Sequence, residues 1–177
     1  FNRFNKIKIK EPDTNLWIDS FSKNDVFWDI GANVGVFSFY SASRGIKTYS
    51  FEPDPMNYSE LIKNVLLNKE DKITPFLVAV GDKKIGNFPL EFDDDGLESG
   101  RAMRTLDTSG LKSGRNGINT ISFNLESLIE YFNIDFPNHL KIDVDGNECM
   151  IILNNLSFLS NINLKSILIE LDIEDIE

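Results

Sequence analysis

The stretch Asp29-Ile30-Gly31-Ala32-Asn33-Val34-Gly35 decides the expected fold, because an apolar strand runs directly into a glycine turn and then a helix. Val26 to Ile30 is the short apolar run typical of a parallel strand covered on both faces. Apolar residues then recur at helical spacing from Val34 to Tyr40. Gly31 can adopt backbone angles closed to other residues, and Gly35 permits close approach of a ligand. The pattern predicts a strand-turn-helix unit that binds a cofactor.

A second strand, Thr48 to Phe51, ends in Glu52 roughly twenty residues after the turn, the spacing at which an acid meets ribose hydroxyls in nucleotide-binding folds. The turn does not complete the G-x-G-x-x-G dinucleotide fingerprint, because Asn33 stands where the second glycine would be. We therefore expect a cofactor without a pyrophosphate. Asp29 could pair with an ammonium group of that cofactor, and backbone N–H groups at the helix start could bind a carboxylate.

The composition predicts one globular domain over residues 1–177, with 41% hydrophobic residues and a net charge of -10. No apolar run approaches the roughly 20 residues that a bilayer span needs, and no secretory leader is expected at the start. The acid excess argues against nucleic acid as a partner, since that partner needs a basic footprint. The single cysteine, Cys149, agrees with a reducing compartment, so we expect a cytoplasmic protein.

The middle of the chain continues to alternate strands and helices. Asp54 and Pro55 suit the start of a helix that ends near Asn68, and Ile73 to Val80 is predicted as the third strand. Asn87 to Phe92 predicts an inserted hairpin. Residues 93–117, with five glycines, are either a solvated excursion or a flexible lid over the substrate.

The sequence pattern typical of strands resumes after residues 93–117. Ile118 to Phe123 reads as a strand, Asn124 as a helix cap, and Ile167 to Leu171 as the fifth core strand. The order of elements predicts an α/β fold with a doubly wound, mostly parallel sheet, and a hairpin or long loop between strands 3 and 4.

The predicted strand Leu140 to Gly146 carries the second set of candidate site residues. Its period of two puts Lys141, Asp143 and Asp145 on one side, near the carboxyl edge where open α/β sheets place their sites. An unpaired ammonium inside an apolar strand is costly, so Lys141 needs a carboxylate. We predict an ion pair with Glu170 on the fifth strand, or alternatively with Asp143 or Asp145 if the register differs. The pair either serves catalysis, by holding the floor of the acceptor pocket and keeping Asp143 ionised, or is only structural.

Several motifs, in this order along the chain, together resemble the FkbM family of S-adenosylmethionine-dependent methyltransferases. They are Phe27 to Gly35, Phe51-Glu52-Pro53, Asn64 to Asn68, Ala79 to Asp82, and Lys141 to Glu148. The resemblance implies a class I, Rossmann-like fold with strand order 3-2-1-4-5. It also implies that the family's acceptors are hydroxyl groups of sugars or polyketide-like natural products.

The resemblance also implies the roles of individual residues. The methionine part of S-adenosylmethionine would be surrounded by Asp29, Gly31, Ala32, Asn33 and Gly35. Glu52 would take the ribose hydroxyls, Pro53 and Val80 would flank adenine, and Asp143 would face the methyl donor.

Two departures from the family pattern stand out. Asp145 replaces the glutamate that many members carry before Gly146, which preserves the charge and shortens its reach. The class I fold also continues past its fifth strand into a helix and strands 6 and 7, whereas this chain stops at Glu177. We expect a C-terminally incomplete domain.

These features predict an enzyme that transfers a methyl group to a hydroxyl oxygen, mainly by positioning the acceptor. Catalytic candidates are Asp143 as base or orienter, with Lys141 and Glu170. His139 starts its strand, away from the expected site, so a structural histidine is the preferred interpretation. A carbohydrate or lipid-linked sugar is the preferred acceptor, followed by a polyketide-like metabolite. The alternatives are a non-catalytic cofactor-binding module and a nicotinamide-dependent oxidoreductase, the latter weakened by Asn33.

Asp143, Asp145, Glu148 and Glu170 could supply oxygen ligands to magnesium. Acids beside Gly146 are, however, favoured at a helix start by capping and by the helix dipole alone. We predict no obligatory metal.

Overall fold

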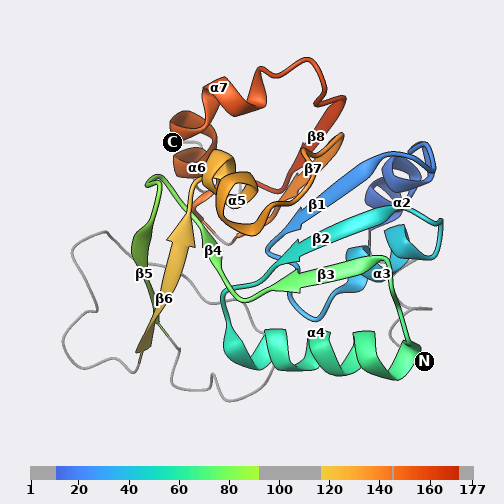
Figure 1. Cartoon of the computed structure of the whole chain (residues 1–177), viewed down its shortest axis with the longest axis horizontal. Helices are drawn as coiled ribbons and strands as arrows, with labels where there is room; N and C mark the ends of the chain where they lie inside the picture. The colour runs from blue at the N-terminus through green and yellow to red at the C-terminus, as the bar shows by residue number, and fades with distance from the viewer. Residues whose placement is uncertain (1–10, 92–116, 145, 172–177) are drawn as a thin grey trace.

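A five-stranded parallel sheet forms the centre of the computed structural model, which describes residues 11–91, 117–144 and 146–171 (Figure 1). The strands, in spatial order, are β3 (Ile73–Phe76), β2 (Lys47–Phe51), β1 (Val26–Ile30), β7 (His139–Ile142) and β8 (Ser166–Ile169). All four neighbouring pairs run parallel. Since β7 and β8 are the fourth and fifth strands of this sheet in chain order, the predicted order 3-2-1-4-5 is confirmed.

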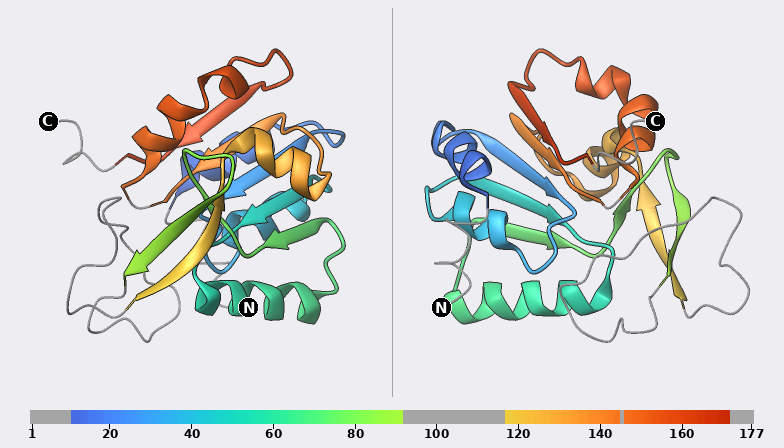
Figure 2. Two further views of the ribbon diagram at one scale, coloured as in Figure 1. Left: turned by 60° about the vertical axis from the view of Figure 1, so that its left-hand side comes forward. Right: turned by 180° about the vertical axis from the view of Figure 1, so that it is seen from behind.

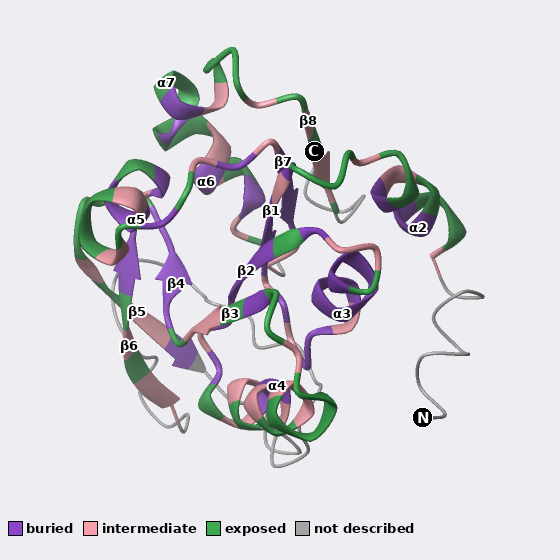
Figure 3. Cartoon of the chain, turned by 45° about the vertical axis from the view of Figure 1, so that its right-hand side comes forward, coloured by how far each residue is buried: buried purple, intermediate pink, exposed green. Residues whose placement is uncertain are grey.

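Helices cover both faces of the sheet: α2 (Pro12–Asp19), α3 (Val36–Ala42), α4 (Pro55–Asn68), α5 (Leu125–Phe132), α6 (Glu148–Asn154) and α7 (Leu156–Leu159). Trp28 and Ile30 of β1 pack in a large core with residues of α5, α6 and α7. A separate core joins α3, α4 and β3 through Phe39, Leu61 and Ile73. Figure 3 shows the central strands β1 and β7, together with α3, among the most deeply buried parts of this arrangement.

Two helices begin as the sequence predicts. The Asp54 carboxylate accepts a hydrogen bond from the Met56 N–H at 2.8 Å, and Pro55 occupies the first helical position of α4. Asn124 Oδ1 accepts from the Ser127 N–H at 3.0 Å and caps α5. Each cap satisfies one N–H group that the helix itself leaves without a partner.

A second, three-stranded sheet lies beside the first and contains β4 (Ala79–Val80), β6 (Gly117–Phe123) and β5 (Gly86–Glu91), in that order. β5 pairs antiparallel with β6, as the predicted hairpin requires, and β4 pairs parallel with β6. The arrowheads of β1, β2 and β3 point toward this small sheet (Figures 1 and 2). The insertion therefore stands at the carboxyl edge of the main sheet.

The prediction of one continuous strand over residues 73–80 is wrong, because the chain leaves the main sheet after Phe76. Ala79 pairs with Ser122 and Val80 with Phe123 in the small sheet. Val78 and Val80 nevertheless stay buried in the same core as Trp28. Residues 76–80 are all apolar, so their pattern could not reveal the bend after Phe76.

Residues 93–116 of the predicted loop or lid lie outside the described residues, and Gly117 begins β6. Asp145 also lies outside them. Within the described ranges, no helix combines the length and apolar character needed to cross a bilayer.

Candidate active site

The turn after β1 is shaped by three residues with positive φ, namely Gly31 at 75°, Asn33 at 51° and Gly35 at 87°. A Cβ atom on Gly31 would lie 1.6 Å from the carbonyl oxygen of Asp143, and one on Gly35 would lie 2.3 Å from Leu61 Cδ1. Only glycine fits at Gly31, because both the backbone angle and the contact exclude a side chain. The turn is thereby pressed directly against the end of β7.

Glu52 joins the end of β2 to this turn. Its carboxylate accepts hydrogen bonds from the Asn33 N–H at 2.6 Å and from the Asp54 N–H at 2.9 Å. The side chain is buried, and burial raises the pKa of Glu52 to about 7. The predicted neighbours Asn33 and Glu52 are therefore brought together. Ala32, also a predicted site residue, is buried, and its N–H donates to the Phe51 carbonyl at 3.1 Å.

Asp29 is 1% exposed and is the most deeply buried acid of the site. Its Oδ2 accepts a hydrogen bond from Ser38 Oγ at 2.5 Å, and Ser38 Oγ lies 2.7 Å from Ser50 Oγ. Asp29 Oδ1 has no hydrogen-bond partner within the described part of the chain. Burial raises the pKa of Asp29, while the charge of Lys141 opposes this shift.

A buried carboxylate oxygen without a hydrogen-bond partner lowers the stability of the folded protein, unless it is protonated or lies beside a cationic group. The residues present therefore fit a ligand that brings an ammonium group to the Gly31 turn.

Ser38 and Ser50 were not among the predicted site residues. Ser50 lies opposite Asp29 in the register of β1 and β2, and Ser38 faces both from α3. The signal in the sequence was a serine in the otherwise apolar, aromatic-rich segments Tyr49 to Phe51 and Phe37 to Phe39.

Lys141 is 1% exposed and forms an ion pair with Asp143. Its Nζ also lies 5.1 Å from the ring centroid of Phe37. In the sheet, Lys141 stands opposite Asp29 on β1 and Leu168 on β8. The ion pair with Glu170, our first prediction, is therefore wrong, and the alternative pair with Asp143 is the one that forms. The register explains this outcome, because Ile169 is opposite Ile142, so Glu170 lies beyond Lys141 along the strand.

Glu170 instead lies beside Asp143. The Glu170 N–H donates to the Ile142 carbonyl at 3.0 Å, which continues the strand pairing past the end of β8. Continuing the pairing of Ile142 with Ile169 by one position places Glu170 opposite Asp143. The charge of Asp143, and then burial, raise the pKa of Glu170. The three catalytic candidates thus gather at the ends of β7 and β8, with Asp143 between Lys141 and Glu170.

Glu148, considered as a metal ligand, is engaged by the backbone. Its carboxylate accepts from the Val144 N–H at 3.0 Å and from the Gly146 N–H at 3.1 Å at the start of α6. Among the described residues, no group of three or more His, Cys, Asp or Glu side chains is arranged to hold a metal ion. The requirement for a metal stays a prediction, partly because Asp145 lies outside the described residues.

The remaining candidates occupy different surroundings. Pro53 follows Glu52 directly and is half-buried, whereas Val80 ends β4 with its side chain in the core beside Phe123. Their proposed contact with adenine stays a prediction.

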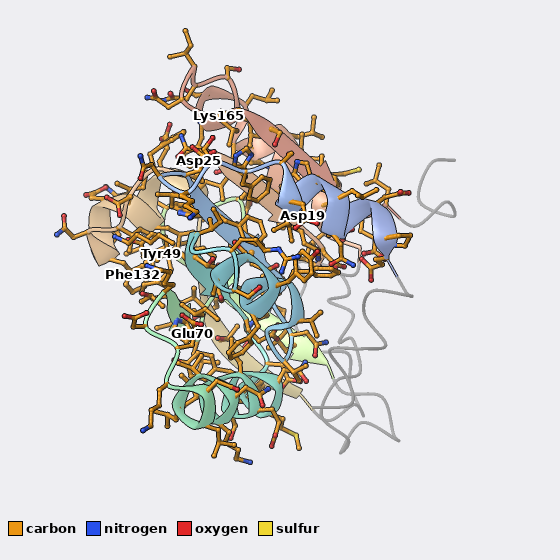
Figure 4. All side chains as sticks on the ribbon, turned by 90° about the vertical axis from the view of Figure 1, so that its right-hand side faces the viewer. Asp19, Asp25, Tyr49, Glu70, Phe132 and Lys165 are labelled. Carbon is orange, nitrogen blue, oxygen red and sulfur yellow. The ribbon has the colours of Figure 1, made fainter. Side chains whose placement is uncertain are left out.

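His139 lies at the amino end of β7, at the opposite edge of the sheet. It is buried, its Nε2 lies 3.0 Å from Asp25 Oδ2, and its Nδ1 lies 2.7 Å from Ser166 Oγ. Asp25 also accepts from Lys165 Nζ at 2.6 Å, and Figure 4 labels both residues at this edge. These contacts agree with the preferred interpretation of His139 as a structural residue.

Taken together, a parallel sheet in the order 3-2-1-4-5, a glycine turn against the fourth strand and an acid closing the second strand define a Rossmann-like domain of the methyltransferase type. Residues 29–174 match the family model described as the methyltransferase FkbM domain. The chain belongs to this family.

Two known proteins are similar to the chain, one in sequence and one in structure. It is 23% identical over 171 residues to the hexuronic acid methyltransferase AglP of Haloferax volcanii, a match that covers 91% of this chain and 62% of the relative. The crystal structure of precorrin-6y C5,15-methyltransferase from Geobacter metallireducens superposes with a TM-score of 0.53 at 12% identity. That match covers 90% of this chain and 61% of the other, and it shows the shared fold. The chain thus spans less than two thirds of the length of either protein.

Proposed function

We propose that this chain binds S-adenosylmethionine and transfers its methyl group to a hydroxyl oxygen of a carbohydrate acceptor. Membership of the FkbM family supports the activity. The observation that carries the proposal is the buried Asp29, whose Oδ1 lacks a hydrogen-bond partner in the described residues beside a turn that only glycine can form. When bound, S-adenosylmethionine supplies a methyl group that is already activated for transfer.

The protein's own residues have distinct parts in this proposal. Asp29 pairs with the ammonium group, and the turn from Gly31 to Gly35 admits the methionine part close to the backbone. Glu52 accepts hydrogen bonds from the ribose hydroxyls, while Pro53 and Val80 border the adenine. Asp143 lies at the boundary between cofactor and acceptor, since its carbonyl contacts the turn and its carboxylate is held by Lys141. Most of the rate enhancement then comes from alignment of the acceptor.

A carbohydrate is the acceptor class that we favour, with a polyketide-like metabolite second. The relative from Haloferax volcanii is named for a hexuronic acid, which supports a sugar. We propose that the reaction takes place in the cytoplasm, because a single cysteine agrees with a reducing compartment.

Two measurements test the proposal. Calorimetry with S-adenosylmethionine and S-adenosylhomocysteine measures cofactor binding, and transfer of an isotopically labelled methyl group to neutral hexosides, hexuronic acids and a polyketide alcohol measures catalysis. Binding together with transfer to a sugar is the expected result. Binding without transfer to any acceptor would indicate a non-catalytic module, and tight NADH binding without S-adenosylmethionine binding would indicate an oxidoreductase.

A further inference from the structure

Two pairs of buried hydroxyl groups join helix α3 to strand β2. In the first pair, Ser38 Oγ of α3 lies 2.7 Å from Ser50 Oγ of β2. In the second pair, about one turn further along the helix, Ser41 Oγ accepts a hydrogen bond from Thr48 Oγ1 at 3.1 Å. All four residues are 0% exposed. Because the helix-covered face of a parallel sheet is usually apolar, two polar pairs at one such interface are unusual.

The two pairs differ in what else they contact. Asp29 on β1 stands opposite Ser50 in the sheet, and Asp29 Oδ2 accepts a hydrogen bond from Ser38 Oγ at 2.5 Å. Opposite Thr48 stands the apolar residue Phe27, and Thr48 Oγ1 donates to the Ile46 carbonyl at 3.2 Å as well as to the second serine of α3. The first pair therefore continues to an acid of the candidate site, and the second offers an internal control.

The number of hydrogens sets the direction of the first set of hydrogen bonds. A serine hydroxyl has a single hydrogen to donate. Since Ser38 donates its hydrogen to Asp29 Oδ2, the donor between the two serines is Ser50. The hydrogen bonds thus run from β2 through α3 to one of the two carboxylate oxygens. A hydroxyl that accepts one hydrogen bond also becomes a stronger donor, so Ser50 strengthens the bond to the acid.

This arrangement leaves the two oxygens of Asp29 in different states. Oδ2 is held by Ser38, whereas Oδ1 has no hydrogen-bond partner within the described residues. Burial raises the pKa of Asp29, and the charge of Lys141 and the hydrogen bond from Ser38 act against that shift. Ser38 therefore favours the ionised carboxylate, which is the form that pairs with an ammonium group.

We infer that Ser38 and Ser50 are positioning residues for the cofactor, because they hold Asp29 Oδ2 and so leave the ionised Oδ1 for the ammonium group of S-adenosylmethionine. This inference rests on the proposed function, in which Asp29 pairs with that group. In this role the serines act through Asp29 and need no contact with the ligand. The packing of α3 on β2 would then help to select ligands that carry an amino group.

The test compares Ser38→Ala and Ser50→Ala with Ser41→Ala, which removes a hydroxyl group from the second pair of the same interface. Calorimetry measures the binding of S-adenosylhomocysteine and of its desamino analogue, which keeps the carboxylate and lacks the amino group. Ser38→Ala should weaken S-adenosylhomocysteine binding about 10-fold, and Ser50→Ala about 3-fold, because a hydrogen bond to a charged group is lost or weakened. Neither change should alter the affinity for the analogue more than about 2-fold.

The control separates this role from a structural one. Ser41→Ala should lower the unfolding midpoint in urea about as much as Ser38→Ala does, yet leave both affinities unchanged. If Ser38→Ala weakens both ligands equally, its effect is structural and the inference is overturned. Unchanged S-adenosylhomocysteine affinity in Ser38→Ala would overturn it as well.

A second measurement needs no analogue. In a double-mutant cycle, Ser38→Ala should have little further effect on S-adenosylhomocysteine binding once Asp29→Asn is present, because the serine acts through that acid. Losses that simply add would show that Ser38 acts by another route and would also overturn the inference. A wild type that binds neither S-adenosylmethionine nor S-adenosylhomocysteine would instead count against the proposed function.

Discussion

Strand β7 carries a polar cluster at each end, and the two clusters differ in how completely their groups are satisfied. At the amino end, Trp17 Nε1 donates to Ser166 Oγ at 2.8 Å, and the Ser166 hydroxyl can donate to His139 Nδ1. His139 Nε2 then donates to Asp25, which also accepts from Lys165. This chain of donors runs in one direction and suits a neutral histidine.

The cluster at the carboxyl end is different. Lys141 binds Asp143, Asp143 meets the second acid Glu170, and Asp29 keeps a buried oxygen without a hydrogen-bond partner in the described residues. The polar groups of the first cluster bind one another, whereas the second cluster holds two neighbouring acids and a buried carboxylate oxygen without a hydrogen-bond partner in the described residues. Buried polar groups whose hydrogen bonds are all formed indicate a structural role. Buried polar groups that lack a hydrogen-bond partner indicate a site for a ligand.

The largest loss of stability should follow the substitution Gly31→Ala in the turn beside the second cluster. A methyl group there overlaps the Asp143 carbonyl and also forces alanine to φ 75°, so we expect a loss of stability of about 3 kcal/mol or more, together with loss of cofactor binding. The matched control is Gly45→Ala, where φ is 83° but nothing lies within 4 Å. The control should cost only about 1 kcal/mol. Urea unfolding and calorimetry measure both; similar losses in the two variants would contradict the close contact.

Removal of a lysine from each cluster should also have unequal effects. Lys141→Met leaves Asp143 and the buried Asp29 without their cation and should destabilise the protein by about 3 kcal/mol. Lys165→Met removes a half-exposed lysine from Asp25, which keeps His139 and the Ser22 N–H as partners, and should cost about 1 kcal/mol. If the ion pair serves catalysis, Lys141→Met should also lower turnover much more than S-adenosylmethionine affinity. Equal unfolding midpoints for the two variants would remove the distinction between the clusters.

Glu52 should make cofactor affinity depend on pH. Burial raises the pKa of Glu52 to about 7, so its ionised form is disfavoured in the free protein below that pH. Ribose hydroxyls donate best to the ionised form, and the affinity for S-adenosylmethionine should therefore increase as the pH rises through about 7. Glu52→Gln should weaken binding roughly 10-fold to 100-fold and flatten this dependence. Calorimetry across this range checks it, with Glu70→Gln at the end of α4 as control; a pH dependence that persists in Glu52→Gln would assign it to another group.

At the amino end, Ser166→Ala should reduce stability without changing cofactor affinity. It leaves Trp17 Nε1 and His139 Nδ1 without their shared partner, at a cost of about 1 to 2 kcal/mol. Ser38→Ala is the matched change at the other end, where it removes the hydrogen bond to Asp29 and should weaken cofactor binding. Altered cofactor affinity in Ser166→Ala would mean that the two ends are coupled.

The same cluster predicts how stability falls in acid. Burial lowers the pKa of His139 from its ordinary value of 6.5, so protonation of the unfolded chain reduces stability as the pH falls below that value. Burial works against ionisation of Asp25, but hydrogen bonds from Lys165 and His139 prevail and hold its pKa at about 2. The stability that Asp25 contributes is present above its ordinary pKa of 3.8 and is lost between there and about 2. His139→Gln should lose the first of these two steps in a pH series of unfolding free energies.

The smallest effect is expected from metal removal. Glu148 is engaged by two backbone N–H groups, and we predict that a chelator leaves methyl transfer unchanged. The measurement is turnover before and after dialysis against the chelator. Loss of activity that magnesium restores would show that the acids at this edge share a cation.

The sequence predicted most of the fold because its signals are local. The apolar run of β1, the Asp54 and Asn124 caps and the glycine turn each lie within a few neighbouring residues. The site was predicted less completely, since its contacts depend on register between strands. The register of β8 decided this outcome, because Lys141 is opposite Leu168 and Glu170 lies two positions further along the strand. Ser38 and Ser50 join Asp29 across three elements, a relation that no single stretch of sequence contains.

The contact between Gly31 and the Asp143 carbonyl also bears on how the protein is made. The two residues are separated by more than half of the chain, so the turn is synthesised long before the strand against which it must pack. Local contacts form early, whereas pairings of this separation carry a large loop-closure cost and form late. A nascent chain that ends before β7 lacks one wall of the cofactor turn, however well β1 and α3 have formed. Cofactor capture during translation should therefore begin only once β7 has left the ribosome, which makes ligand binding a reporter of the packing of β7 against the turn.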